Sequence, residues 1–131
     1  MEQLSTAGSD VAKPTGTRRL YVALISVHGL IRGQSLELGR DADTGGQTRY
    51  VVELARALAE HPDIAQVDLL TRRVLDSGLS ADYARHLETL SDTVRIIRLD
   101  CGEEAYIPKE QLWGCLDVFA DNALQWLREH E

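Results

Sequence analysis

The sequence predicts an α/β fold in which a parallel sheet is flanked by covering helices. Three short apolar runs alternate with amphipathic segments along the 131 residues, and this alternation is typical of a parallel sheet. A long loop, residues 28–43, follows the first apolar run and contains three glycines. Loops of this length inside a compact domain are usually functional. The pattern therefore indicates both the fold class and the place of a site.

Each element has its own signal. The first strand is expected over Leu20 to Val27, because a continuously apolar run is typical of a strand covered on both faces. A helix is expected over Thr48 to Glu60, where apolar residues recur at the helical period and where His61-Pro62 ends it. These apolar positions are Val51, Leu54, Ala55 and Leu58.

The second half of the chain continues the alternation. Strands are expected at Val67 to Thr71 and at Thr93 to Leu99, and residues 79–90 between them show weak helical periodicity. A closing helix is expected from Pro108, with Gly114 as its weak point. Its apolar stripe comprises Leu112, Leu116, Phe119, Ala123 and Leu127. A sheet of only three strands is thin for this class, which predicts an incomplete domain.

Composition excludes several classes of protein. A net charge of −7 and a pI near 5.0 argue against nucleic acid and membrane surfaces as partners. No apolar run approaches the roughly 18 residues of a membrane span, and the N-terminus lacks a signal-peptide pattern. Residues 1–17 are expected to be a disordered leader before one folded unit, residues 18–131. Cys101 and Cys115 fit neither a disulfide framework nor a metal site, so a cytoplasmic protein is expected.

The most informative motif is Gly-Arg-Asp-Ala-Asp-Thr-Gly-Gly-Gln, residues 39–47. It precedes the first helix, whose exposed backbone N–H groups suit a phosphate or a polyhydroxylated ligand. Gly45 and Gly46 have no Cβ, so a ligand can approach the main chain closely. A second interpretation needs no ligand, because Thr44 and Gln47 fit a helix-capping box. The loop follows the carboxyl end of a strand, where such sheets bind ligands.

Several blocks of the chain resemble the sucrose-phosphate synthase family and occur in the family's order over residues 20–130. The blocks are Ile25 to Gln47, Tyr50 to Ala59, Val67 to Arg73 and Tyr106 to Trp113. The resemblance implies a retaining GT-B glycosyltransferase, in which two Rossmann-like domains face each other across a cleft. On this basis the chain is expected to be a truncated N-terminal, acceptor-side Rossmann-like domain. Sucrose synthase and mannosylfructose-phosphate synthase share the Gly-Gly-Gln loop.

The resemblance also implies an activity, the transfer of glucose from UDP-glucose to fructose 6-phosphate to give sucrose 6-phosphate. The chain alone is expected to be inactive, because the C-terminal donor domain and the catalytic groups would lie outside it. The partners are then small sugar substrates and that missing domain, with UDP-glucose as a substrate and no cofactor or metal. The alternatives are a sucrose synthase-like or mannosylfructose-phosphate synthase-like enzyme, a non-catalytic sugar- or partner-binding relic, or an interaction module with an exposed sheet edge.

The implied substrate-binding residues are Gly45, Gly46, Gln47 and Lys109. The glycine backbone would lie near the donor diphosphate, and the Gln47 amide would hold the fructosyl acceptor. Lys109 falls in a basic block that assists recognition of the acceptor phosphate, although a solvated charge at a helix start explains it equally well.

The chain departs from the family pattern at Ala105, where a basic residue is usual. Glu103 and Glu104 precede it, and we expect two carboxylates near a sugar-phosphate site to repel the phosphate.

Other polar and aromatic residues are expected to be structural. His28 is expected to make a structural hydrogen bond, and Asp41 and Asp43 to favour the helix N-terminus rather than bind a metal. The remaining expectations are packing or surface roles for Arg72 and Arg73, with Arg72 also able to face the cleft, buried thiols for both cysteines, and core or domain contacts for Trp113 and Trp126.

Overall fold

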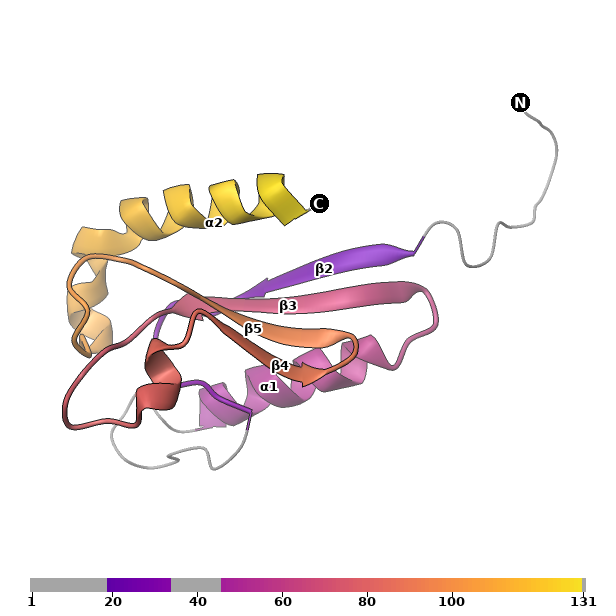
Figure 1. Ribbon diagram of the computed structural model, residues 1–131, viewed down its shortest axis with the longest axis horizontal. Coiled ribbons are helices and arrows are strands. Elements are labelled where there is room, and N and C mark those ends of the chain that lie inside the picture. Colours follow the sequence, from indigo (N-terminus) through magenta and orange to yellow (C-terminus); the bar gives the residue numbers. More distant parts are fainter. Residues whose placement is uncertain (1–18, 34–45, 131) are drawn as a thin grey trace, which may run out of the picture.

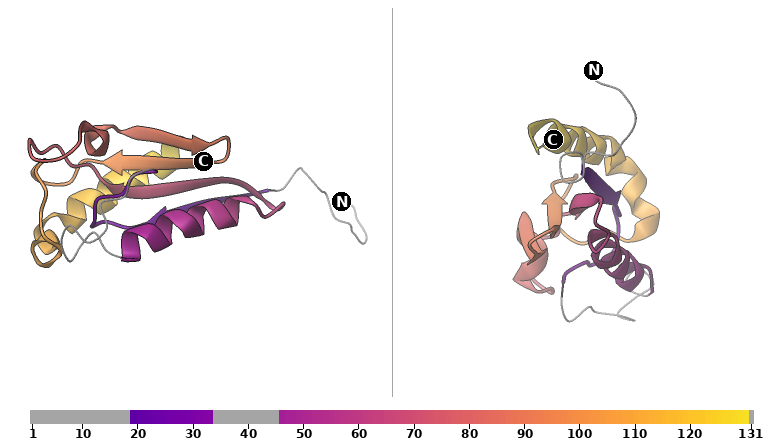
Figure 2. Two further views of the ribbon diagram at one scale, coloured as in Figure 1. Left: turned by 90° about the horizontal axis from the view of Figure 1, so that it is seen from below. Right: turned by 90° about the vertical axis from the view of Figure 1, so that its right-hand side faces the viewer.

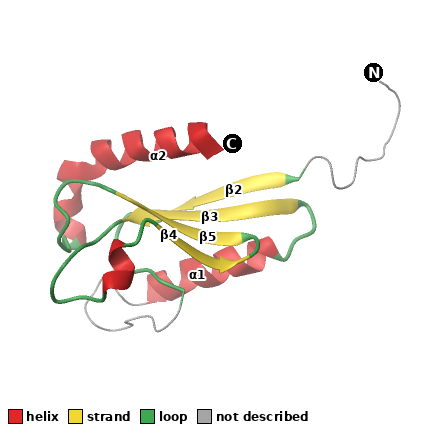
Figure 3. Ribbon diagram, in the orientation of Figure 1, coloured by secondary structure: helices red, strands yellow, loops and turns green. Residues whose placement is uncertain are grey.

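The computed structural model describes residues 19–33 and 46–130, which form a four-stranded sheet with a long helix on each face (Figures 1 and 3). The elements are β2 (Leu20–Ile25), α1 (Gly46–Ala59), β3 (Ile64–Arg72), the 3-10 helix η2 (Ala81–Ala84), β4 (Leu87–Ser91), β5 (Val94–Leu99), the 3-10 helix η3 (Lys109–Cys115) and α2 (Leu116–His130). The strand order is β2-β3-β5-β4. The expected leader lies outside the described residues.

The three expected strands are all present and run parallel to one another. In one row across the sheet, Leu24 of β2 pairs with Leu69 of β3, which pairs with Ile96 of β5. In the preceding row, Ala23, Asp68 and Arg95 are the corresponding partners. Because side chains alternate along a strand, these two rows face opposite sides of the sheet. The α/β class predicted from the sequence is confirmed.

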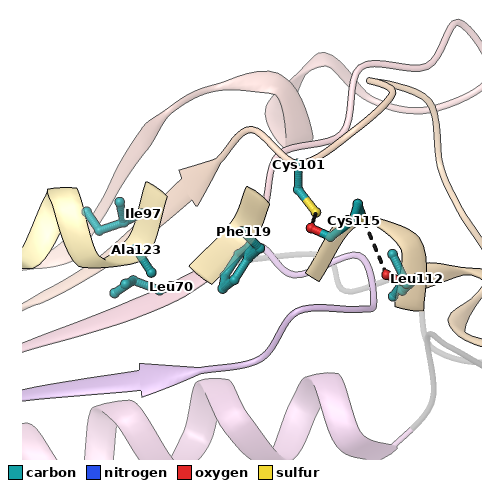
Figure 4. Packing of buried hydrophobic residues seen from close by; sticks show 7 residues of the cluster. All are labelled: Leu70, Ile97, Cys101, Leu112, Cys115, Phe119 and Ala123. Atoms are coloured by element: carbon teal, nitrogen blue, oxygen red, sulfur yellow. Dashed lines mark hydrogen bonds between the residues drawn. The ribbon is translucent and has the colours of Figure 1, made fainter. Parts of the chain in front are cut away.

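Helices lie on both faces of the sheet, as the end-on view of Figure 2 shows, and each face carries its own layer of buried side chains. On one face α1 buries Val51 and Ala55 of its predicted apolar stripe against the sheet, together with Val52, which was not part of that prediction. On the other face Phe119 and Ala123 of α2 pack over Leu70 of β3 (Figure 4). Full burial of each large apolar side chain contributes about 1.5–3 kcal/mol. The central strand β3 is the most buried, because it has strands on both edges and helices on both faces.

The sheet differs from the expected one at both edges. The helical periodicity of residues 79–90 is misleading, because the segment forms only the short η2 and then the antiparallel edge strand β4. Glu88 and Leu90 alternate with more exposed neighbours in β4, so a two-residue period prevails there. At the other edge, no residue of β2 is fully buried, because within the described residues β2 pairs only with β3.

The closing helix begins differently from the prediction. Pro108 precedes it, as expected, but the first turns form the 3-10 helix η3. The change to α-helical geometry falls between Cys115 and Leu116, one residue after Gly114. The expected weak point at Gly114 therefore lies next to the boundary between η3 and α2.

The buried carboxylate of Asp68 helps to hold α2 on the sheet through Arg95. Asp68 of β3 is fully buried and accepts two bonds of 2.7 Å from Arg95 and one of 2.6 Å from the Tyr21 hydroxyl. The Arg95 guanidinium lies 5.8 Å from the ring centroid of Trp126 on α2. Burial, together with the bond donated to Asp68, raises the pKa of Tyr21 to about 12. Tyr21 is therefore neutral wherever the protein is folded near neutral pH.

We expect Asp68→Asn to lower the free energy of unfolding by about 2–4 kcal/mol, since Arg95 would lose the charge that balances it. Denaturant unfolding of the chain measures this change. Glu53→Gln is the matched control: it breaks the exposed Arg49–Glu53 pair and should cost at most about 0.5 kcal/mol. Equal losses in the two variants would contradict the structural role of Asp68.

Candidate functional site

The candidate site lies at the carboxyl edge of the parallel strands. Ser26 and His28 follow β2, and Gln47 lies in the first turn of α1. Lys109 begins η3, and Trp113 lies one turn further along it. We call these five residues the carboxyl-edge site. Open α/β sheets bind ligands at this edge, so the fold places the residues where chemistry is expected.

Gln47 connects the start of α1 to the end of β2. Its side chain is exposed, and its Nε2 donates a hydrogen bond of 2.5 Å to the Ser26 hydroxyl. Ser26 is itself buried and donates its backbone N–H to the Leu70 carbonyl at 2.9 Å. The Gln47 amide retains a second N–H and a carbonyl oxygen, which can serve as donor and acceptor for a sugar hydroxyl. This contact holds the amide at a defined place on the edge.

The two glycines before Gln47 are placed only in part. Gly46 is the first residue of α1, so its backbone belongs to the unbonded first turn. Gly45 lies outside the described residues, as do Thr44 of the capping box and the acidic pair Asp41 and Asp43. The ligand-loop and capping interpretations therefore both remain predictions for that part of the motif.

Lys109 lines a pocket of about 340 Å³ that opens at the same edge. The other lining residues come from the end of β2 and from η3 and α2: Val27, His28, Glu110, Leu112, Trp113 and Leu116. Small-molecule pockets start at about 300 Å³, so the space suits a single sugar ring. The structure thus brings Lys109 beside His28, two residues from the serine that holds Gln47.

Arg72 determines the path of the chain into η3. The side chain is buried, contrary to a position facing the cleft, and its guanidinium donates to three backbone carbonyls of the loop after β5. The acceptors are Cys101 at 3.1 Å, Ala105 at 2.7 Å and Glu103. Arg72 is therefore a packing residue, which was one of the roles expected from the sequence.

The two carboxylates that precede Ala105 do not line the Lys109 pocket. Glu104 is paired with Arg73 at 3.3 Å, and Glu103 borders a separate hollow of about 230 Å³. Glu110, which the sequence did not single out, is the carboxylate that lines the pocket with Lys109. Within the described residues, the carboxylate next to Lys109 in this pocket is therefore that of Glu110, and the expected repulsion by Glu103 and Glu104 stays a prediction.

The tryptophans and cysteines divide into core and surface. Trp126 packs against the core, as expected, whereas Trp113 is 80% exposed and does not belong to it. Cys101 and Cys115 are buried free thiols, in agreement with the prediction. Burial, together with the side-chain interaction with Cys115, raises the pKa of Cys101 to about 12, which keeps the thiol protonated.

Sequence reasoning missed Ser26, and it assigned Trp113 to the core or to a domain contact rather than to the pocket. Ser26 carried a usable signal, because it is a polar residue near the carboxyl end of the otherwise apolar run from Leu20 to Val27. The other hydroxyl of that run belongs to Tyr21, near its start. In the part of the chain that the structure describes, no three His, Cys, Asp or Glu side chains are grouped to hold a metal. None of the helices in the described ranges combines the length and apolar character needed to cross a bilayer.

The fold and the edge define a Rossmann-like α/β unit with a site at its carboxyl edge. No family model matches the chain. Sucrose-phosphate synthase 4 of Arabidopsis thaliana is 49% identical over 117 residues, covering 82% of this chain and 11% of that protein. Sucrose-phosphate synthase of Spinacia oleracea is 45% identical over 127 residues, covering 86% of this chain and 12% of that protein.

The solved sucrose-phosphate synthase from Thermosynechococcus elongatus shares the fold, with a TM-score of 0.66 and 33% identity over 82% of this chain and 24% of that chain. The chain belongs to the sucrose-phosphate synthase family. It spans only 11–12% of the length of the two curated relatives.

We expect Arg72→Met to lower the free energy of unfolding by about 2–4 kcal/mol, because buried carbonyls would lose their donor. Amide hydrogen exchange of residues 101–105 should also become faster, through local opening that does not require global unfolding. Arg128→Met, at an exposed position of α2, is the matched control and should change stability by no more than about 0.5 kcal/mol. Unchanged exchange in the loop would contradict the role assigned to Arg72.

Proposed function

We propose that this chain forms the acceptor side of a retaining GT-B glycosyltransferase that transfers glucose from UDP-glucose to fructose 6-phosphate, giving sucrose 6-phosphate. The observation that carries the proposal is the Gln47–Ser26 contact at the carboxyl edge, in a chain whose relatives are sucrose-phosphate synthases. The contact holds an exposed amide of the Gly-Gly-Gln motif at the place where this fold binds ligands. A location in the cytoplasm is part of the same proposal.

The residues suit the chemistry of a sugar acceptor. The Gln47 amide offers donor and acceptor groups to hydroxyls of the fructosyl ring. Backbone N–H groups of the first turn of α1, at Gly46 and Gln47, lie at the positive end of the helix and favour the developing charge on a departing diphosphate. Lys109, across the edge in its pocket, supplies a cation for the acceptor phosphate.

The share of the relatives that this chain covers limits its part in the reaction. Because it spans 11–12% of their length, we place the groups that hold UDP-glucose and stabilise its departure outside these 131 residues. The chain alone should then bind acceptor weakly and form no sucrose 6-phosphate. Turnover by the purified chain would contradict this division.

We expect Gln47→Ala to weaken binding of fructose 6-phosphate about 5- to 10-fold, since one hydrogen bond contributes about 1 kcal/mol and 1.4 kcal/mol is tenfold in affinity. NMR titration of the chain with fructose 6-phosphate measures it through the backbone amides of residues 46–48. Free fructose and inorganic phosphate, titrated separately, show which part of the acceptor is recognised.

Two variants sharpen this titration. Ser26→Ala should weaken binding less than Gln47→Ala, because it only releases the amide from its position. Gln125→Ala, an exposed glutamine on α2, should have no effect. If fructose 6-phosphate leaves the amides of residues 46–48 unmoved, or if Gln47→Ala binds as the unsubstituted chain does, the proposed acceptor role is wrong.

A further inference from the structure

The two cysteines of the chain meet where the loop after β5 contacts the end of η3. Cys101 lies in that loop, Cys115 is the last residue of η3, and both are buried free thiols. Figure 4 shows the Cys101 sulfur directed at the backbone of Cys115, whose carbonyl oxygen lies 2.9 Å away. The sequence contains no other cysteine. An internal disulfide therefore has a single possible pairing.

Gly102 allows the loop to approach Cys115 closely. Its φ is 69°, in the left-handed region that favours glycine. A Cβ atom at this position would lie 3.0 Å from the Cys115 Cβ and 3.8 Å from the Cys115 Sγ. The backbone next to Cys101 thus passes directly against the Cys115 side chain. A disulfide requires such proximity, because its two Cβ atoms are about 3.5–4.5 Å apart.

The two thiols differ in their access to solvent. Cys115 borders a hollow of about 230 Å³, whose wall also includes Gly102 and Gly114. Two of the residues around the sulfur therefore have no side chain to obstruct a reagent. Cys101 is more deeply buried, at 2% exposure compared with 7% for Cys115. A small reagent reaches Cys115 first, and Cys101 is placed to react with it afterwards.

We propose that Cys101 and Cys115 are a redox modification site, which a small-molecule disulfide of the glutathione type oxidises to a reversible internal disulfide. The Cys115 thiolate attacks one sulfur of the oxidant and displaces one thiolate, which leaves a mixed disulfide on Cys115. Cys101 then attacks the Cys115 sulfur and displaces the second thiolate. Each cysteine gives up one proton and each leaving thiolate takes one up, so two protein thiols are oxidised and one disulfide is reduced to two thiols. The site is independent of the proposed substrates.

The surroundings of Cys101 suit the second step. Burial raises its pKa most and the Cys115 side chain raises it further, whereas Arg72 and the backbone of Phe119 lower it. Once Cys115 carries a mixed disulfide, its thiol no longer opposes ionisation of Cys101. Arg72 and Phe119 still favour the thiolate, which is the form that attacks a disulfide.

Oxidation of the pair changes the hydrogen bonds of η3. In the reduced chain the Cys101 thiol donates to the Cys115 carbonyl at 2.9 Å, and the Cys115 thiol donates to the Leu112 carbonyl at 3.4 Å. A disulfide sulfur carries no proton, so both bonds are lost when the sulfurs join. Leu112 lines the Lys109 pocket. The redox state of the pair therefore acts on the turn of η3 that carries Lys109.

The test exposes the reduced 131-residue chain to glutathione buffers of rising oxidised fraction, followed by alkylation with iodoacetamide and intact-mass measurement. The reduced chain should take up two alkyl groups, and the oxidised chain should take up none and be lighter by two hydrogen atoms. Dithiothreitol should restore both thiols. Cys101→Ser should stop at the mixed disulfide on Cys115, and Cys115→Ser should remain unmodified. Two persistent free thiols, a stable mixed disulfide in the unsubstituted chain, or a disulfide between two chains would overturn the proposal.

Two glycine substitutions form a matched pair, because both positions border the hollow beside Cys115. Gly102→Ala should slow disulfide formation at least about tenfold, since its Cβ would displace the Cys115 side chain. Gly114→Ala is the control, because a Cβ there meets nothing within 4 Å, and it should oxidise as the unsubstituted chain does. Equal rates in the two variants would contradict the geometry assigned to the pair.

The effect on η3 has its own readout. The backbone amide resonances of residues 109–116 and the fluorescence of the exposed Trp113 should change on oxidation of the unsubstituted chain. They should not change when Cys101→Ser is treated with dithiothreitol or left in air. If the disulfide forms while these signals stay constant, the coupling of the pair to η3 is wrong.

Discussion

The structure around the site depends on one buried guanidinium. Arg72 ends the central strand and holds the loop after β5 through three backbone carbonyls. A buried cation costs free energy unless hydrogen bonds satisfy it, and the planar, forked guanidinium can reach several carbonyls where an ammonium cannot. The loop leads directly into η3, so the positions of Lys109 and Trp113 follow from this interaction. A residue of the core thereby sets the geometry of the surface.

A second buried arginine works in the same way on the other side of the sheet. Arg98 of β5 donates to the Ile31 carbonyl at 2.8 Å and to the Arg85 carbonyl at 3.2 Å, and it pairs with Glu88 at 2.7 Å. It therefore connects the segment after β2 with the edge strand β4. Loops that carry function are generally held by a rigid scaffold. Here two guanidinium groups provide that support, and Gln47, Lys109 and Trp113 of the site remain exposed.

Local patterns in the sequence predict the parts of the fold that depend on local physics. The parallel strands follow from apolar runs, and α1 follows from its 3.6-residue period. The strand β4 could not be predicted in this way, because Leu87 and Leu90, three residues apart, fit a helical period. In the strand they lie on opposite faces, and pairing with β5 decides the conformation. Gln47 and Lys109 were predicted through resemblance, whereas the roles of Ser26 and Arg72 depend on contacts between segments distant in sequence.

The open edge and the candidate site belong to the same corner of the fold. Gln47 is held against the end of β2, and β2 is the strand whose outer side has no partner among the described residues. The pocket at this corner is bordered by the end of β2 on one side and by η3 and the start of α2 on the other. The end of β2 therefore contributes twice to the site: it positions the Gln47 amide through Ser26, and it forms one wall of the pocket that Lys109 lines.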